Sequence, residues 1–568
     1  MGTAEQTRAE DSQFINQCNL MSLHAQCRLP LKWTTPPEIA SSPKKSYRSA
    51  YVYPWQAELA DPAQVLAWKD LSNFDLLLRL VDFSGLRPVL AHLLGWRSGR
   101  GWEPFDPVSF FLLTVWQITN KWTRNQTLKN MLDSRYADYV AWFGFQKGVY
   151  PTEGGMLYFL TTLGRKSDAS HKTISVEKGK EIVEIEIQKL NMLLVEAVGV
   201  LRQTPLLSPQ AWEKALICPD GQIHDAASSL GCISVTEACY QPCTSENPRP
   251  CHAKDKERRG CDCNTLACAQ VCRQATPRDP QARFIWYTPS NQPGDSPNLS
   301  TKKDATKREE GDARYGYRSL PLRLADPDRR FSITLLDDVR PANEHEDVPC
   351  AALLLQIEAQ YPDLHVNAVA GDAGFGFEAF LHTIYARLHA LRVVDRRCNP
   401  TDQDKEQWAT RGYDDHGRPV CQFGYALNSY GFERERQRHK WCCDQACLHG
   451  RDPCTRLSQV TYPPSECPYQ TDEHQHGRIL NVGERFADAS IRLVRDIPMG
   501  SPAWKALYRR VRNAVEGRNA TFENWGFKRM AVFGLARSKA LLFLADVLDT
   551  LSTLARLVRE ATLASLAT

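Results

Sequence analysis

Apolar positions recur at helical spacing through the first third of the chain. They predict two short helices between Pro62 and about Trp96, and an amphipathic helix from Val108 to Ile118. Asp106 is placed to cap the latter helix, with Pro107 at its first position. The same spacing predicts further helices at 126–132, at 136–143 and from residue 156 onward.

These compact helices admit two interpretations. With Trp122, Arg124 and Lys129 between them, they can form a helix-turn-helix DNA reader, in which one helix enters the major groove. A plain helical bundle fits the spacing equally well. The charged segment Lys172–Arg202 is predicted as one long amphipathic helix that bridges domains, and the polar, proline-punctuated residues 1–60 are predicted as an N-terminal arm.

Two short apolar runs that end in an acidic residue follow. Residues 215–219 lead to Asp220, and the β-branched run 365–371 leads to Asp372. Each pattern predicts a buried strand that delivers a carboxylate to the edge of a sheet, where it can reach a metal ion. For Asp372 alone, a strand followed by an Asx turn is the simpler explanation, and Asp225 competes with Asp220 for the first position.

The segments between and after these runs complete the expected core. Residues 284–287 predict a strand, 315–326 and 331–336 a hairpin, 348–361 and 378–389 helices, and the run from residue 390 another strand. This order predicts an α/β fold: an RNase H-like mixed sheet flanked by helices, with a helical N-terminal domain and two cysteine-rich insertions.

Most of the 19 cysteines gather in those two insertions, at 228–280 and 398–483. Segments so poor in apolar residues need a cross-link or a bound metal to hold their fold, and closely spaced thiolates bind zinc tetrahedrally. The alternative is that part of these thiols are free. The pairs Cys239/Cys243 and Cys268/Cys272 suit such a site, and Cys443/Cys447 suits a zinc ribbon. The predicted structural zinc ligands are Cys239, Cys243, Cys251, Cys261, Cys263, Cys268, Cys272, Cys443 and Cys447.

Charge and hydropathy bear on the partners and the cellular compartment of the protein. The net charge of +4 over 568 residues hides basic clusters at 434–440 and 509–529, which can meet phosphates or form solvated faces. The chain shows no signal peptide and no membrane span, so we expect an intracellular protein. A reducing compartment favours zinc over disulfides for its cysteines.

A basic helix predicted near the C-terminus carries one more acidic candidate. Arg512 and Glu516 lie four residues apart and therefore share one helix face, with Val511 and Val515 on an adjoining apolar side. Taken alone, this pair is explained by an ordinary surface ion pair.

Several of these segments, in this order, resemble bacterial insertion-sequence transposases of the DDE type. The resemblance includes the Gly101–Pro107 segment with the helices after it, the Asp220-Gly segment and the Arg512/Glu516 helix with its apolar C-terminal successor. Three further matching segments are Tyr315-Gly-Tyr, Pro341-Ala-Asn-Glu-His and Gly371-Asp-Ala-Gly-Phe. The chain departs from one branch of the family, since Tyr508 stands one place early and Glu523 occupies a lysine position. The cysteine-rich insertions are not general family features.

The resemblance implies a domain plan and a chemistry. Residues 61–205 would form a helical DNA-binding domain, and residues 206–397 with 484–568 the catalytic core. Asp220, Asp372 and Glu516 would hold two Mg²⁺ or Mn²⁺ ions, Asp220 bridging both, Asp372 holding one and Glu516 the other. Arg512, Arg518 and Lys528 would contact phosphates.

The implied reaction is cleavage at element ends, followed by attack of the freed 3′ hydroxyl on target DNA. The implied partners are double-stranded DNA and a second copy of the chain, in a bacterial cytoplasm near the nucleoid. The alternative is a catalytically inactive, zinc-stabilised DNA-binding protein derived from such an enzyme. A thiol-rich metal-storage protein is disfavoured, because the cysteines cluster in two insertions rather than throughout the chain.

Overall fold

The structure, a computed structural model, describes part of the chain. The described residues are 29–36, 39, 47–95, 103–168, 172–178, 181–227, 279, 281–287, 312–326, 331–394, 410–413, 418–421, 426–433, 436, 438–442, 479–483 and 502–566. All nine predicted zinc ligands lie outside these ranges, so the zinc sites stay a prediction.

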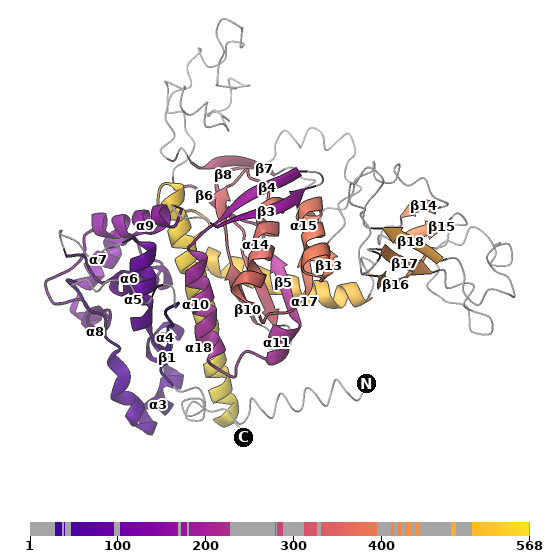
Figure 1. Cartoon of the computed structure of the whole chain (residues 1–568). Helices are drawn as coiled ribbons and strands as arrows, with labels where there is room; N and C mark the ends of the chain where they lie inside the picture. The colour runs from indigo at the N-terminus through magenta and orange to yellow at the C-terminus, as the bar shows by residue number, and fades with distance from the viewer. Residues whose placement is uncertain are drawn as a thin grey trace, which may run out of the picture.

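A five-stranded mixed sheet lies at the centre of the molecule (Figure 1). Its strand order is β10-β9-β5-β12-β13. The strands β5, β12 and β13 run parallel, whereas β9 is antiparallel to both β5 and β10. The strands are β5 (Ala215–Pro219), β9 (Leu322–Asp326), β10 (Phe331–Leu336), β12 (Val366–Gly371) and β13 (Leu391–Val394). The predicted α/β class, and the hairpin that ends in 331–336, are confirmed.

Both faces of this sheet are buried, because alternate side chains of each strand enter different cores. Leu216 and Cys218 of β5 face Val511 and Val515 of helix α17 (Pro502–Asn524), whereas Ile217 enters the main core. Helix α14 (Asp347–Gln360) and helix α10 (Asn191–Arg202) both contact β10 and contribute to the main core. The sheet is thus a middle layer between helices.

A second sheet includes residues 315–319, which were predicted to belong to the same strand as 322–326 of the first sheet. Strand β8 (Asp312–Ser319) pairs with β6 (Gln222–Asp225), β7 (Arg283–Tyr287) and β11 (Val339–Pro341). The single strand predicted over 315–326 is therefore wrong, since the chain leaves β8 at Leu320 and enters β9 only after Pro321. Proline cannot donate to a ladder, which favours a strand break at this point.

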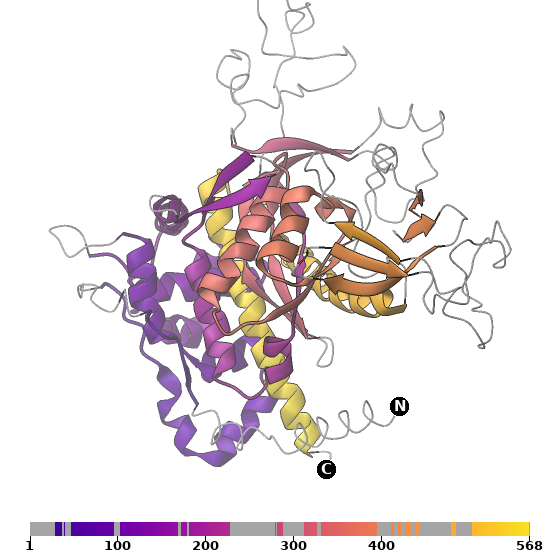
Figure 2. The ribbon, with the colours of Figure 1, turned by 45° about the vertical axis from the view of Figure 1, so that its right-hand side comes forward.

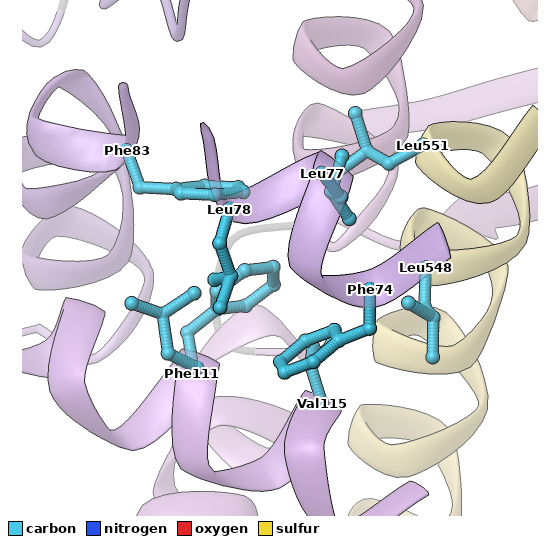
Figure 3. A pocket seen from close by; sticks show the side chains of 9 residues that line it. Phe74, Leu77, Leu78, Phe83, Phe111, Val115, Leu548 and Leu551 are labelled. Atoms are coloured by element: carbon cyan, nitrogen blue, oxygen red, sulfur yellow. The ribbon is translucent and has the colours of Figure 1, made fainter. Parts of the chain in front are cut away.

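The N-terminal helices and the central sheets share one continuous apolar core. The helices are α3 (Pro62–Ala67), α4 (Asn73–Leu80), α5 (Leu86–Leu93), α6 (Pro107–Thr119), α7 (Arg124–Met131), α8 (Ala137–Trp142) and α9 (Glu153–Asp168). Asp106 accepts a hydrogen bond from the Val108 amide, which confirms its predicted capping role. The C-terminal helix α18 (Leu535–Leu566) runs among them, and Figure 3 shows its Leu548 and Leu551 beside α4 and α6. The boundary expected at residue 205 therefore does not divide this core.

The described part of residues 1–60 also belongs to this core. Strand β1 (Leu31–Lys32) pairs with β2 (Val81–Asp82), and Trp33, Tyr51 and Trp55 are buried. These residues do not form the separate polar arm that was expected.

The predicted long helix at 172–202 is wrong in its first half. The structure forms an antiparallel hairpin of β3 (Lys172–Lys178) and β4 (Glu181–Ile187), and only α10 is helical. Val183, Ile185 and Ile187 alternate with acidic residues, a period-two pattern of β-branched side chains that favours a strand.

The remaining described elements lie around the sheet. Besides short 3₁₀ turns, they are α11 (Pro209–Glu213), α15 (Glu378–His382) with the π-helical turn Thr383–Arg387, and the strands β14 (Thr410–Tyr413), β15 (Pro419–Cys421), β16 (Asn428–Glu433), β17 (Arg438–Cys442) and β18 (Ile479–Gly483). The last three form their own antiparallel sheet within the second insertion, beside α17 (Figure 2). None of the described helices combines the length and the apolarity needed to cross a bilayer.

Candidate carboxylate site

Asp220 and Asp372 lie at the same edge of the five-stranded sheet. Asp220 follows β5 and Asp372 follows β12, and these two strands are parallel neighbours. The register that pairs Ile217 with Val369 places the two aspartates level with each other, three residues further along each strand. Adjacent strands are about 4.8 Å apart, so the fold brings two carboxylates from distant parts of the sequence together.

Helix α17 places an arginine between these two acids. Arg512 Nη1 lies 3.4 Å from Asp220 Oδ1 and 3.9 Å from Asp372 Oδ2. The side chains of Arg512 and Asp220 are 16 % and 11 % exposed, whereas that of Asp372 is 40 % exposed. One cation therefore contacts both carboxylates at a site that opens to solvent on the Asp372 side.

The same helix face carries Asn519 and Glu516. Asn519 Nδ2 donates to Asp220 Oδ2 over 2.5 Å. Glu516 lies four residues after Arg512 and three before Asn519, a spacing that puts all three on one face. Its own side chain is exposed. The fold thus brings the helix of the third predicted acid to the two aspartates, and Arg512 pairs with those aspartates instead of forming an isolated surface pair.

Glu346 is a fourth acid of this site, and the sequence interpretation missed it. It directly precedes α14, and its Oε2 accepts a hydrogen bond of 3.1 Å from Arg318 Nη1 of β8. Its carboxylate lies against Gly221 and Gly374, the glycines that closely follow Asp220 and Asp372. A signal was present, because Glu346 and Arg318 each stand immediately beside a segment that resembles the transposases.

Burial and neighbouring charge disfavour the ionised form of Glu346. Burial raises the pKa of its carboxyl to about 7, and the charges of Asp372 and Asp220 add to this, against the opposing effects of Arg318 and Arg512. Such a shift is typical of a carboxylate that shares a confined space with other carboxylates.

These donors fit a hard divalent cation. Carboxylate oxygens are the ligands that Mg²⁺ and Mn²⁺ prefer, and Arg512 demonstrates that a single positive group reaches both Asp220 and Asp372. In the described part of the chain, no three Asp, Glu, His or Cys side chains are already gathered at metal-ligand distances. An ion at this site would therefore take over the place that the guanidinium holds.

Arg518, predicted to contact phosphate, is instead fully buried, so that prediction is wrong. Its guanidinium pairs with Asp546 of α18, with Nη2 2.8 Å from Oδ2, and lies 3.7 Å from Asp337. Nη1 donates to Gln222 and Ser319. Six residues separate it from Arg512, which puts the two side chains about 120° apart around the helix, so the two arginines face different sides.

The other predicted residues have clear positions. Lys528 is exposed just after α17, a position that suits a phosphate contact. Asp225, the competitor of Asp220, ends β6 in the second sheet and pairs with Arg314 at 2.8 Å. It therefore occupies a different location from the Asp372 carboxylate.

Comparisons with known proteins identify no relative. No protein-family model matches the chain, and neither the curated proteins nor the solved structures contain a significant match.

Proposed function

We propose that this chain is a DDE-type transposase, a metal-dependent enzyme that cleaves DNA at element ends and joins them to target DNA. The observation that carries the proposal is the meeting of Asp220 and Asp372 at one sheet edge, with the Glu516 helix against them. Sequence order alone did not require these segments to converge.

The sheet supports an RNase H-like assignment for the core. Three strands, β5, β9 and β10, form an antiparallel meander, and β12 and β13 extend it in parallel from β5. An RNase H-like core requires this mixed order, with the acids at the ends of the first and fourth strands. Asp220 and Asp372 occupy those two ends.

The residues of the chain suggest how the site would work. Asp220, Asp372 and Glu516 would hold two divalent ions, which would supply water activation and stabilise the leaving 3′ oxygen. Asn519 orients Asp220 through its hydrogen bond. Arg512, once released from the aspartates, would neutralise a backbone phosphate, and exposed Lys528 would contribute a second contact.

A cleavage and joining assay tests the proposal. The full chain is incubated with Mg²⁺ or Mn²⁺ and duplexes from the flanks of its coding region, and strand cleavage and joined products are measured on gels. Asp372→Asn should abolish both reactions while end binding persists, because it removes one ligand charge and little volume. Asp225→Asn, which changes the aspartate paired with Arg314, is the matched control and should keep activity.

Two results would overturn the proposal. Unchanged cleavage by the Asp372→Asn protein removes Asp372 from the reaction. End-specific binding by the wild-type chain without any cleavage would instead favour the alternative, a transposase-derived DNA-binding protein that has lost catalysis.

A further inference from the structure

Glu346 is held in a cradle formed by two glycines. A Cβ atom on Gly221 would lie 2.3 Å from Glu346 Oε2, and a Cβ on Gly374 would lie 2.6 Å from Glu346 Oε1. Real Cβ atoms do not approach other atoms so closely, so any other residue at either position would displace the carboxylate. The two turns that carry the aspartates therefore leave room for one more acid between them.

This placement brings Glu346 next to Asp372. The point that a Gly374 Cβ would occupy lies 2.6 Å from Glu346 Oε1 and only 2.8 Å from Asp372 Oδ1. Two carboxylate oxygens thus border the same small space, in a region where the Glu346 side chain is 18 % exposed. Two negative charges that border the same small space repel each other unless a cation lies between them or one of them is protonated.

Only one of the two oxygens of the Glu346 carboxylate accepts a hydrogen bond from a described residue. Arg318 donates to Oε2, whereas Oε1 has no hydrogen-bond donor among the described residues. Oε1 is the oxygen that borders the same space as Asp372 Oδ1, beside the hypothetical Cβ of Gly374. The oxygen that remains available is therefore the one directed at the candidate ion site.

We propose that Glu346 is a further metal-holding residue of this site, binding a divalent ion together with Asp372 and Asp220. The inference rests on the proposed function, because it adds a ligand to the same site. Glu346 precedes α14 and is half-buried, whereas the Glu516 side chain of α17 is exposed. The protein would thus offer four carboxylates, enough for two ions that also keep water and phosphate ligands.

Binding of Mn²⁺ to the full chain, without DNA, tests this inference by titration and electron paramagnetic resonance. Glu346→Gln keeps the shape of the side chain but removes its charge, and Mn²⁺ affinity should fall by roughly tenfold or more. Glu346→Asp keeps the charge but withdraws the carboxylate, and it should give an intermediate affinity. Glu344→Gln is the matched control two residues earlier, where the side chain pairs with Arg340, and it should bind as wild type does.

The Asp372→Asn variant separates the two levels of the argument. If it loses Mn²⁺ binding while Glu346→Gln and Glu346→Asp bind as wild type does, Glu346 is only a partner for Arg318 and the proposed function stands. If Asp372→Asn and wild type bind Mn²⁺ equally, or neither binds it, the proposed function fails together with this inference. Circular dichroism spectra and thermal unfolding identify any variant that does not fold, and the remaining Glu346 variant then decides.

Discussion

Two clusters of arginine and aspartate lie along the same helix, and they differ in their access to solvent. At the carboxylate site, Arg512 contacts Asp220 and a half-exposed Asp372 through single distances of 3.4 and 3.9 Å. In the buried cluster, Arg518 grips Asp546 through two nitrogens, and neither side chain is exposed.

The difference shows how identical residue types take different roles. A charged group that is buried away from solvent must be fully paired, since an unpaired charge in the interior costs several kcal/mol. Such a cluster joins α17, α18 and the second sheet, and it cannot exchange partners. The open cluster has long, imperfect contacts, so its arginine can be replaced by another cation. The buried cluster around Arg518 fixes the position of the helix, and the open cluster around Arg512 is available for a ligand.

Removing Arg518 should have the largest effect. Arg518→Met leaves Asp546 and Asp337 buried without their cation, and the free energy of unfolding should fall by about 3–5 kcal/mol. Chemical denaturation measures this loss. Arg518→Lys, which keeps the charge but not the two-nitrogen grip, should lose less, and a loss below 1 kcal/mol in Arg518→Met would contradict the assignment of a sealed cluster.

Acid should destabilise the sealed region through His224. This side chain contacts Phe527 O at 2.8 Å and Ser319 Oγ at 2.9 Å, and Ser319 in turn accepts from Arg518. Burial, with the nearby charge of Arg518, lowers the pKa of His224 to about 3. The unfolded chain therefore binds the proton first, so stability is present above about pH 6.5 and is lost as the pH falls toward 3.

The expected loss from His224 is roughly 3 kcal/mol at pH 4 relative to pH 7. Denaturation curves at several pH values measure it. His224→Gln should be less stable at pH 7 but should show a shallower fall between pH 6.5 and pH 4. Equal slopes in the two proteins would exclude His224 as the cause.

Removing Arg512 should affect stability less and metal binding more. Arg512→Gln leaves Asp220 with its Asn519 hydrogen bond and Asp372 with access to water, so unfolding should become easier by only roughly 1–2 kcal/mol. Mn²⁺ binding should become tighter, because the competing guanidinium is gone. A loss of stability as large as that of Arg518→Met, with unchanged Mn²⁺ affinity, would make the two clusters equivalent.

The smallest change in stability is expected for Gly374→Ala. The new methyl group would meet Glu346 Oε1 and Asp372 Oδ1, the ends of two side chains that can shift, so the cost should be under about 1 kcal/mol. Mn²⁺ affinity should nevertheless fall, since the two oxygens must separate. Gly517→Ala in α17 is the control, because nothing lies within 4 Å of its Cβ position. It should raise stability by about 0.5–1 kcal/mol and leave Mn²⁺ binding intact.

Local sequence patterns were sufficient to predict the strands and the helix that carry Asp220, Asp372 and Arg512. The short apolar runs before Asp220 and Asp372 predicted β5 and β12, and the spacing of Arg512, Val515 and Glu516 predicted the faces of α17. They failed at 172–187, where alternation of β-branched residues was taken for a helical pattern. Glu346 stands directly after one of the transposase-like segments, but it was missed because its role depends on Gly221 and Gly374, and Gly221 is distant in sequence.

The sequence by itself determined which residues share a strand or a helix face, because backbone geometry fixes a period of two or of 3.6 residues. It could not decide what each face meets. Only the tertiary structure set Arg512 against Asp220 and Asp372 and set Arg518 against Asp546 and Asp337, from strands and helices far away in the chain. Burial and charge pairing depend on the residues that the fold brings together. Two arginines of one basic helix therefore differ, since the Arg512 cation can be replaced and the Arg518 cation cannot.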